Sequence, residues 1–149
     1  MRTVRQAGLA LVILLAVTAA LQADLKRAMA EPDLEKRSKL ALDNAFAAYQ
    51  SARDQYLKGE LEQSKIYIDE IGQSVELAYQ SLNATGKNPR RSPKYFKSAE
   101  LSTRDLVRRL AGFQEQMSYD DRHLLDPLKE RVQQVHDELL LGLMEGKKR

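Results

Sequence analysis

The chain has 149 residues with no cysteine and no tryptophan, and its 24 Lys and Arg side chains nearly balance 21 Asp and Glu, for a net charge of +3. The lack of cysteine excludes a disulfide scaffold and covalently attached haem. At this length we expect a single domain that buries roughly two-thirds of the surface of its unfolded chain, so hydrophobic packing alone must hold it together.

Residues 1–23, MRTVRQAGLALVILLAVTAALQA, have the layout of a signal peptide. Arginines precede the apolar run Leu9 to Val17, and small residues follow it. This run is shorter than the ~20 residues needed to cross a bilayer. We expect export by the general secretory route to the periplasm or outside the cell, with cleavage after Ala23 or Ala19. Retention of the leader as an anchor is the alternative, and membrane contact is expected only in that case.

After a short extension, residues 24–31, the first predicted helix covers about 32–58, with Pro32 in its first turn. Apolar and small residues recur in it at alternating spacings of three and four, the period of a helix packed along one face. They are Leu42, Ala45, Tyr49, Ala52 and Tyr56.

The second predicted helix lies within residues 60–86, between Gly59 and Gly86, which suit helix ends because glycine tolerates a positive φ. Its apolar stripe has the same alternating spacing: Leu61, Ser64, Ile68, Ile71, Val75, Ala78 and Leu82. The stretch 52–68 resembles the turn within a tetratricopeptide hairpin. The position 34 residues beyond Gly59 is Pro93, at a helix start, so the resemblance covers one hairpin at most.

The third predicted helix begins with Ser92 as N-cap and Pro93 as the first helical residue. Its stripe is Ala99, Thr103, Leu106, Leu110, Phe113 and Met117. The fourth follows the sequence SYDD, with Leu125, Leu128, Val132, Val135 and Leu139 in its stripe. Pro127 predicts a short helix or a kink over 120–126.

These elements predict an all-α protein: an antiparallel up-down-up-down four-helix bundle over residues 32–146, preceded by a signal peptide and followed by a basic tail, 147–149. Acid–base pairs four residues apart are interpreted as markers of solvated faces. They are Asp33/Arg37, Glu35/Lys39, Asp54/Lys58, Glu100/Arg104 and Asp105/Arg109.

The sequence does not favour catalysis or a metal centre. A di-iron bundle needs Glu three residues before His on two helices, whereas Asp120 precedes His123 and Gln133 precedes His136. In one straight helix the two histidines would lie about 220° apart around the axis, so we expect them to face solvent or flank helices. The acids are expected on outward faces. We therefore expect no enzyme activity, no metal site and no cofactor.

Residues 87–97, KNPRRSPKYFK, carry five basic side chains and no acid. Arg90, Arg91, Lys94 and Lys97 are the candidate anion-binding residues, because an anion would relieve the repulsion of cations at a helix N-terminus. The alternative is a solvated strap that pairs with acids of a neighbouring helix. Nucleic acid is not favoured, because removal of residues 1–23 lowers the net charge to +1.

Residues 138–144, ELLLGLM, spread apolar side chains over more than half of a helix, which is more than a bundle core can cover. Leu140, Leu141 and Met144 are therefore the candidate interaction surface. The segment Asp24 to Ala30, a second copy of the chain or another protein could cover it.

Together these patterns predict an exported, non-enzymatic helical module that acts through protein contacts, or self-association, as a subunit, adaptor or scaffold of the cell envelope. The alternative is an anion-binding module that uses the basic stretch.

Overall fold

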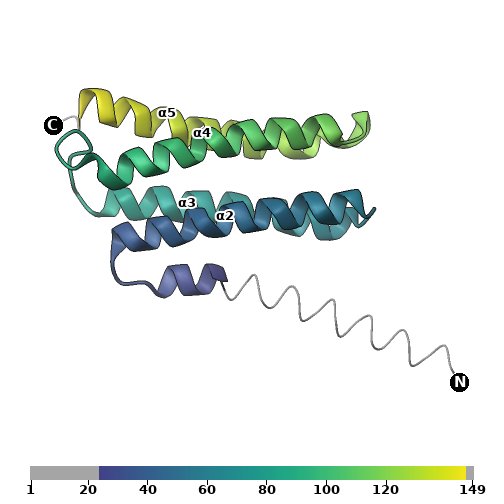
Figure 1. Cartoon of the computed structure of the whole chain (residues 1–149), viewed down its shortest axis with the longest axis horizontal. Helices are drawn as coiled ribbons and strands as arrows, with labels where there is room; N and C mark the ends of the chain where they lie inside the picture. The colour runs from purple at the N-terminus through teal and green to yellow at the C-terminus, as the bar shows by residue number, and fades with distance from the viewer. Residues whose placement is uncertain (1–23, 147–149) are drawn as a thin grey trace, which may run out of the picture.

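The computed structural model describes residues 24–146, which are helical over most of their length and contain no strand. The long helices are α2 (Leu34–Leu57), α3 (Leu61–Ala84), α4 (Pro93–Gln116) and α5 (Asp126–Glu145), with a 3₁₀ helix, η1 (Tyr119–Leu125), before α5. The all-α prediction is confirmed, and the arrangement is compatible with a helical bundle (Figure 1). The predicted signal peptide and basic tail lie outside the described residues.

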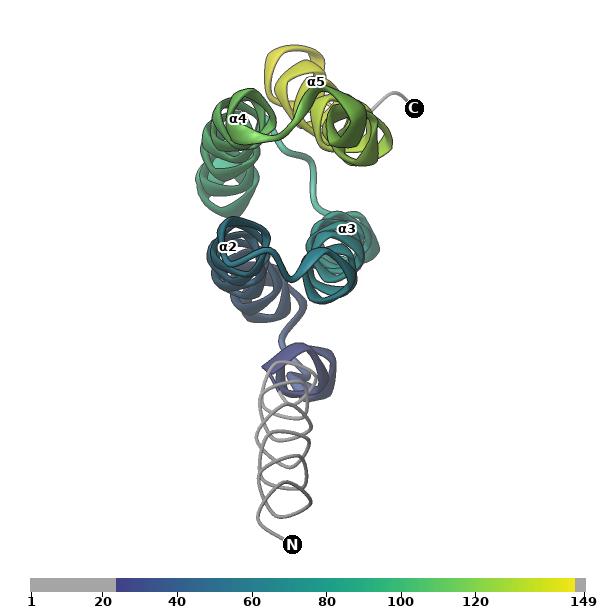
Figure 2. The same ribbon diagram turned by 90° about the vertical axis from the view of Figure 1, so that its right-hand side faces the viewer.

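The helices are arranged as two side-by-side pairs. In Figure 2, α2 lies beside α3 and α4 beside α5, and one pair is stacked on the other. The contact between α2 and α3 is the most extensive in the fold, followed by that between α4 and α5. Each helix therefore contacts its neighbour within the pair more extensively than it contacts any single helix of the other pair.

The helix ends follow their local sequence closely. Gly59 and Gly86 adopt φ values of 82° and 66°, as their predicted places at helix ends require. Pro32, predicted in the first turn of a helix, instead lies before it, and α2 begins after Asp33. The Asp33 carboxylate accepts hydrogen bonds from the N–H groups of Lys36 and Glu35, which lowers its pKa. This capping fixes the start at Leu34.

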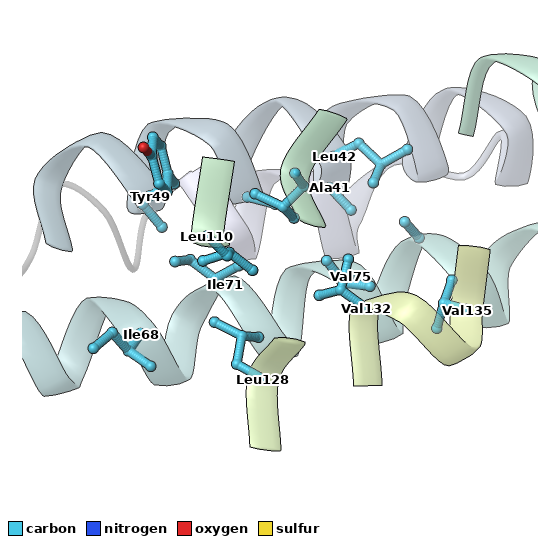
Figure 3. Packing of buried hydrophobic residues seen from close by; sticks show 14 of the residues in the cluster. Ala41, Leu42, Tyr49, Ile68, Ile71, Val75, Leu110, Leu128, Val132 and Val135 are labelled. Atoms are coloured by element: carbon cyan, nitrogen blue, oxygen red, sulfur yellow. The ribbon is translucent and has the colours of Figure 1, made fainter. Parts of the chain in front are cut away.

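The predicted apolar stripes form the core. On α3 the stripe from Ser64 to Leu82 is buried, as are the predicted residues of α4 and α5, while Leu61 and Tyr56 are only half-buried. Figure 3 shows Ile71 and Val75 of α3 pointing towards Leu110 of α4 and Val132 of α5. The core is thus shared by both helix pairs, and all of its buried hydrophobic residues lie between positions 28 and 139.

The buried face of α2 is wider than predicted, because Ser38, Ala41 and Ala48 join the predicted Ala45 and Ala52 in a second stripe. This stripe consists of small residues that also alternate by three and four. Ser64 of α3 donates a hydrogen bond to the Ala52 carbonyl oxygen over 2.8 Å, which places this stripe against α3. Small side chains let two helices approach closely, which accounts for the extensive contact.

The surface ion pairs differ in part from the predicted ones. Glu100–Arg104 and Asp105–Arg109 form salt bridges of 2.6 and 2.8 Å. The remaining predicted pairs form none within residues 24–146. In two of them a member has another partner: Asp33 caps α2, and Lys39 pairs with Asp43.

The N-terminal segment, residues 24–30, is helical and packs on α2, on the side away from α4 and α5 (Figure 1, Figure 2). Ala28 is buried there, in a small cavity whose α2 side includes Leu40, Asn44 and Ala47. The possibility that this segment covers residues 138–144 is therefore wrong. The short connection over 31–33 keeps the segment beside the helix that follows it.

Candidate functional site

An apolar groove of about 600 Å³ lies between α3 and the start of α5. Ile68 and Gly72 of α3 face Leu124, Pro127 and Leu128 across it. Polar and charged side chains complete the lining: Lys65, Asp69, Gln73, Glu76 and Arg131. The groove could not be predicted from the sequence, because it depends on the spacing of two helices that belong to different pairs.

Gly72 lies on the α3 side of the groove, opposite Leu128. A Cβ atom added at this position would lie 3.6 Å from Cδ1 of Leu128, an ordinary van der Waals contact, so the glycine leaves the room of a missing side chain. The α3 face that would otherwise fill the groove is therefore interrupted at its centre. A glycine in the interior of the second predicted helix, next to Ile71 of its apolar stripe, was the signal in the sequence that could have indicated this opening.

One charged residue of the groove also ties the two helix pairs together. The Arg131 guanidinium of α5 contacts the Glu76 carboxylate of α3 through two nitrogens, at 2.8 and 2.9 Å. It also lies 5.9 Å from the centroid of the Tyr79 ring. This two-nitrogen contact holds α5 in register with α3 beside the groove.

A buried polar cluster lies between α2 and α3. The Asn44 amide nitrogen donates to Glu70 Oε1 at 3.0 Å and to Ser74 Oγ at 2.9 Å. Asn44 Oδ1 is buried and has no hydrogen-bond partner within the described residues. Burial raises the pKa of the nearby Tyr67 hydroxyl, and the Glu70 carboxylate adds to this rise. The expectation that the acids lie on outward faces is wrong for Glu70, since the tight α2–α3 contact encloses it.

A second polar cluster joins α4 to α5. Glu100 and His136 are only 3% and 9% exposed, so the prediction of a solvated Glu100 and of a solvent-facing His136 is wrong. His136 Nδ1 lies 3.3 Å from the Glu100 carbonyl oxygen and 3.6 Å from its carboxylate, which also binds Arg104. The contact between α4 and α5 is wider than the apolar stripes, so positions beside Ala99 and Val135 are covered as well.

His123 lies in the exposed 3₁₀ helix, where its Nδ1 donates to the Asp120 carbonyl oxygen over 2.6 Å. This confirms the prediction of a histidine that flanks a helix. Within residues 24–146, no group of three or more His, Cys, Asp or Glu side chains is placed to hold a metal ion.

The predicted anion-binding residues Arg90, Arg91, Lys94 and Lys97 are all exposed. None of the four forms a salt bridge in the part of the chain that the structure describes. Lys87 of the same stretch instead binds Glu35 of α2 at 2.7 Å, a contact that raises the pKa of Lys87. The basic stretch is thus a strap anchored by Lys87, with its other basic side chains directed to solvent.

The strap also contacts the end of α5. A Cβ atom added to Gly142 would lie 3.2 Å from Cγ of Pro89, and one added to Gly146 would lie 3.2 Å from Oδ1 of Asn88 and 3.7 Å from Cβ of Arg90. These two glycines let the strap pass close to the helix. Sequence reasoning did not bring the basic strap and residues 138–144 together.

The predicted interaction residues Leu140, Leu141 and Met144 are 39%, 48% and 67% exposed, whereas Leu139 beside them is buried. The prediction that this segment carries more apolar surface than the core covers is confirmed for the described residues.

No protein-family model matches the chain, and no curated protein shows significant similarity to it. In residues 24–146, no helix is both long and apolar enough to span a membrane.

Proposed function

We propose that residues 1–23 direct export as a signal peptide and that the remaining chain, an antiparallel up-down-up-down bundle, is a non-enzymatic module of the cell envelope that binds another protein. The observation that supports this proposal is the apolar groove between α3 and α5, because its hydrophobic lining is open at the surface of the protein.

The groove suits an amphipathic helix of a protein partner. Its α3 side runs from Lys65 to Glu76, which corresponds to about 16 Å, or three helical turns. Ile68, Leu124 and Leu128 would receive apolar side chains spaced by three or four residues. Charged groups of the partner would meet Lys65 and Asp69, whose opposite charges favour one direction of the bound helix.

Filling the groove tests this proposal. Gly72→Leu should place a side chain in the groove and weaken partner binding at least tenfold. Gly112→Leu is the matched control, since an added Cβ at Gly112 of α4 would have no neighbour within 4 Å. Binding is measured by calorimetry with a purified partner, first captured from the envelope by the wild-type protein. Equal loss of binding in both variants, or in neither, would contradict the groove as the site.

The second candidate function is anion binding by Arg90, Arg91, Lys94 and Lys97. The exposure of these four side chains favours it, together with their lack of acidic partners within residues 24–146. Replacement of Arg90, Arg91 and Lys94 by Gln should then abolish the amide shifts caused by sulfate or phosphate in NMR titrations, and should leave the groove-dependent binding unchanged.

A further inference from the structure

Two surfaces that are far apart in the sequence meet at one end of the bundle. The strap that connects α3 to α4 packs on the last turn of α5 through Pro89 and Asn88 (Figure 1). Arg90 and Arg91 therefore lie beside the helix end that exposes Leu141 and Met144. This end of the molecule combines exposed apolar side chains with exposed cations.

The apolar side chains lie on the outer face of α5. Positions 140, 141 and 144 fall within about 100° of one another around the helix, opposite the buried positions 132, 135 and 139. They form a compact apolar patch at the tip of the helix. The residues that follow Gly146 in the sequence, Lys147, Lys148 and Arg149, are all basic.

Charge is distributed unevenly along the bundle axis. The basic strap and the patch lie at one end. The connections at the opposite end contain two cations, Lys58 and Arg122, and four acids: Glu60, Asp120, Asp121 and Asp126. The exported chain is almost neutral overall. The uneven distribution of charge along the axis, and not the net charge, would therefore determine how the molecule orients near a charged surface. A strongly anionic surface would attract the strap end and repel the other.

We propose that the strap end of the molecule docks onto the surface of an anionic lipid bilayer. Leu140, Leu141 and Met144 enter the boundary between headgroups and acyl chains, while Arg90, Arg91, Lys94 and Lys97 contact lipid phosphates. Interfacial binding of this kind depends on apolar burial and on electrostatic attraction together. Each basic residue near such a surface contributes roughly a fivefold gain in affinity.

The charge pattern favours a bilayer over a second copy of the chain. A symmetric dimer through the α5 patch would bring two basic straps towards each other, and like charges across an interface oppose association. An anionic bilayer can bury the apolar side chains and also pair its phosphates with the cations. This inference does not depend on the groove, which lies along the other half of α5.

Vesicle flotation tests the proposal. The protein is residues 24–149, which retain the whole described core, and circular dichroism verifies their fold. We expect binding to vesicles of phosphatidylcholine with about 30% phosphatidylglycerol and none to pure phosphatidylcholine. Raising the salt from about 0.05 to about 0.5 M should reduce binding about tenfold or more, because screening weakens surface attraction.

Matched variants locate the contact. Leu141→Glu should reduce binding at least tenfold, whereas Leu101→Glu on α4, where the side chain is 47% exposed, should not change it. Joint replacement of Arg90, Arg91, Lys94 and Lys97 by Gln should reduce binding at least tenfold. Replacement of Lys58 and Arg122, at the opposite end, should leave it unchanged. Glu145→Gln, which removes an acid beside Met144, should increase binding.

Fluorescence reports insertion directly, because the chain has no tryptophan. Leu141→Trp should show a blue-shifted emission on anionic vesicles, and Leu101→Trp should show none. Binding to neutral vesicles, equal loss for Leu141→Glu and Leu101→Glu, or an unshifted emission of the Leu141→Trp variant would overturn the proposal. A dimer that Leu141→Glu dissociates without any effect on flotation would also overturn it. Complete competition by about 10 mM inorganic phosphate at constant ionic strength would indicate a site for a free anion and would overturn it as well.

Discussion

Asn44 places a primary amide inside the contact between α2 and α3, the most extensive contact of the fold. Its nitrogen serves two acceptors, Glu70 and Ser74, while its buried oxygen lacks a partner among the described residues. A buried carboxylate without a hydrogen-bond donor is more costly than one with a donor. The amide therefore makes the enclosure of Glu70 tolerable, and Ser74 completes the arrangement.

Replacing Asn44 tests this role. Asn44→Ala should lower the free energy of unfolding by about 1–3 kcal/mol, because it leaves Glu70 without its donor. Urea denaturation followed by circular dichroism measures the change. Gln50→Ala, at an exposed position of the same helix, should change the free energy by less than about 0.5 kcal/mol. Similar losses in both variants would mean that the amide contributes nothing specific.

Ile71 lies at the centre of the core, fully buried among residues of both helix pairs. Ile71→Ala should lower the free energy of unfolding by about 2–5 kcal/mol, through lost burial and the cavity that remains. Ile66→Ala makes the same chemical change on the exposed side of α3, where it should cost less than about 1 kcal/mol. Urea denaturation of the two variants side by side gives the comparison. Equal losses would contradict the assigned core face.

At the scale of the helices, α4 and α5 each contain a glycine in the helix interior, and the surroundings of the two glycines differ. Gly112 of α4 has no neighbour within 4 Å of an added Cβ, whereas Gly142 of α5 lies against Pro89. Glycine lowers helix stability by about 1 kcal/mol relative to alanine. The glycine in α4 therefore has no packing role, and the one in α5 makes room for the strap.

Alanine at the two positions should give different results. Gly112→Ala should raise the free energy of unfolding by about 0.5–1 kcal/mol through helix propensity alone. Gly142→Ala should gain less or be destabilising, because its Cβ would lie 3.2 Å from the Pro89 ring. Thermal denaturation of both variants measures the difference. A gain of equal size at Gly142 would show that the strap moves freely.

The 3₁₀ helix η1 is fastened to α2 by a small hydrogen-bond network. Asp121 Oδ2 accepts from Ser118 Oγ at 2.8 Å and from the Tyr56 hydroxyl at 2.9 Å. These two bonds, the first more strongly, lower the pKa of the Asp121 carboxyl below its usual 3.8. Because the folded pKa is depressed, the stabilisation is present above the unfolded pKa and is lost as the pH falls through the folded one.

Tyr56→Phe should therefore raise the pKa of Asp121 towards its ordinary value, since one of the two hydrogen bonds is removed. Carboxyl carbon chemical shifts followed between about pH 2 and 6 give this pKa directly. Tyr119→Phe changes an exposed tyrosine in the same helix and should leave the pKa of Asp121 unaltered. An unchanged pKa in Tyr56→Phe would contradict the network.

At the scale of the whole molecule, two helix pairs of unequal cohesion share one core. The α2–α3 contact is wide and lined by small residues, while the contacts between the pairs are narrower and leave the groove open. Local opening is favoured where fewer buried contacts must be broken. The pair α4–α5 is therefore expected to open locally more easily than α2–α3. This pair contributes one side of the groove and the apolar patch at the end of α5.

Hydrogen exchange tests this difference. Amides in the central turns of α2 and α3 should exchange several-fold more slowly than those of α4 and α5, because opening the first pair disrupts the most extensive contact of the fold. Exchange is followed by NMR under native conditions. Uniform protection in all four helices would indicate a single cooperative unit and would contradict unequal pairs.

The helical class, the core stripes, the 3₁₀ segment before Pro127 and the exposed leucines near position 140 could all be predicted from the sequence. Each depends on the periodicity of one helix or on a local signal at its end. The burial of Glu100 and His136 could not be predicted in this way, because both lie just beside an apolar stripe. Whether such positions are covered depends on how wide the contact with the neighbouring helix is.

By itself, the sequence determined which face of each helix is apolar, since that follows from spacing along one chain segment. Only the tertiary structure decided the groove beside Gly72, the docking of residues 24–30 on α2 and the meeting of the basic strap with the end of α5. The groove and the strap contact depend on distances between segments far apart in the chain, and the docking of residues 24–30 depends on the direction in which the chain turns over residues 31–33. Side-chain periodicity contains no information about these distances or about that direction.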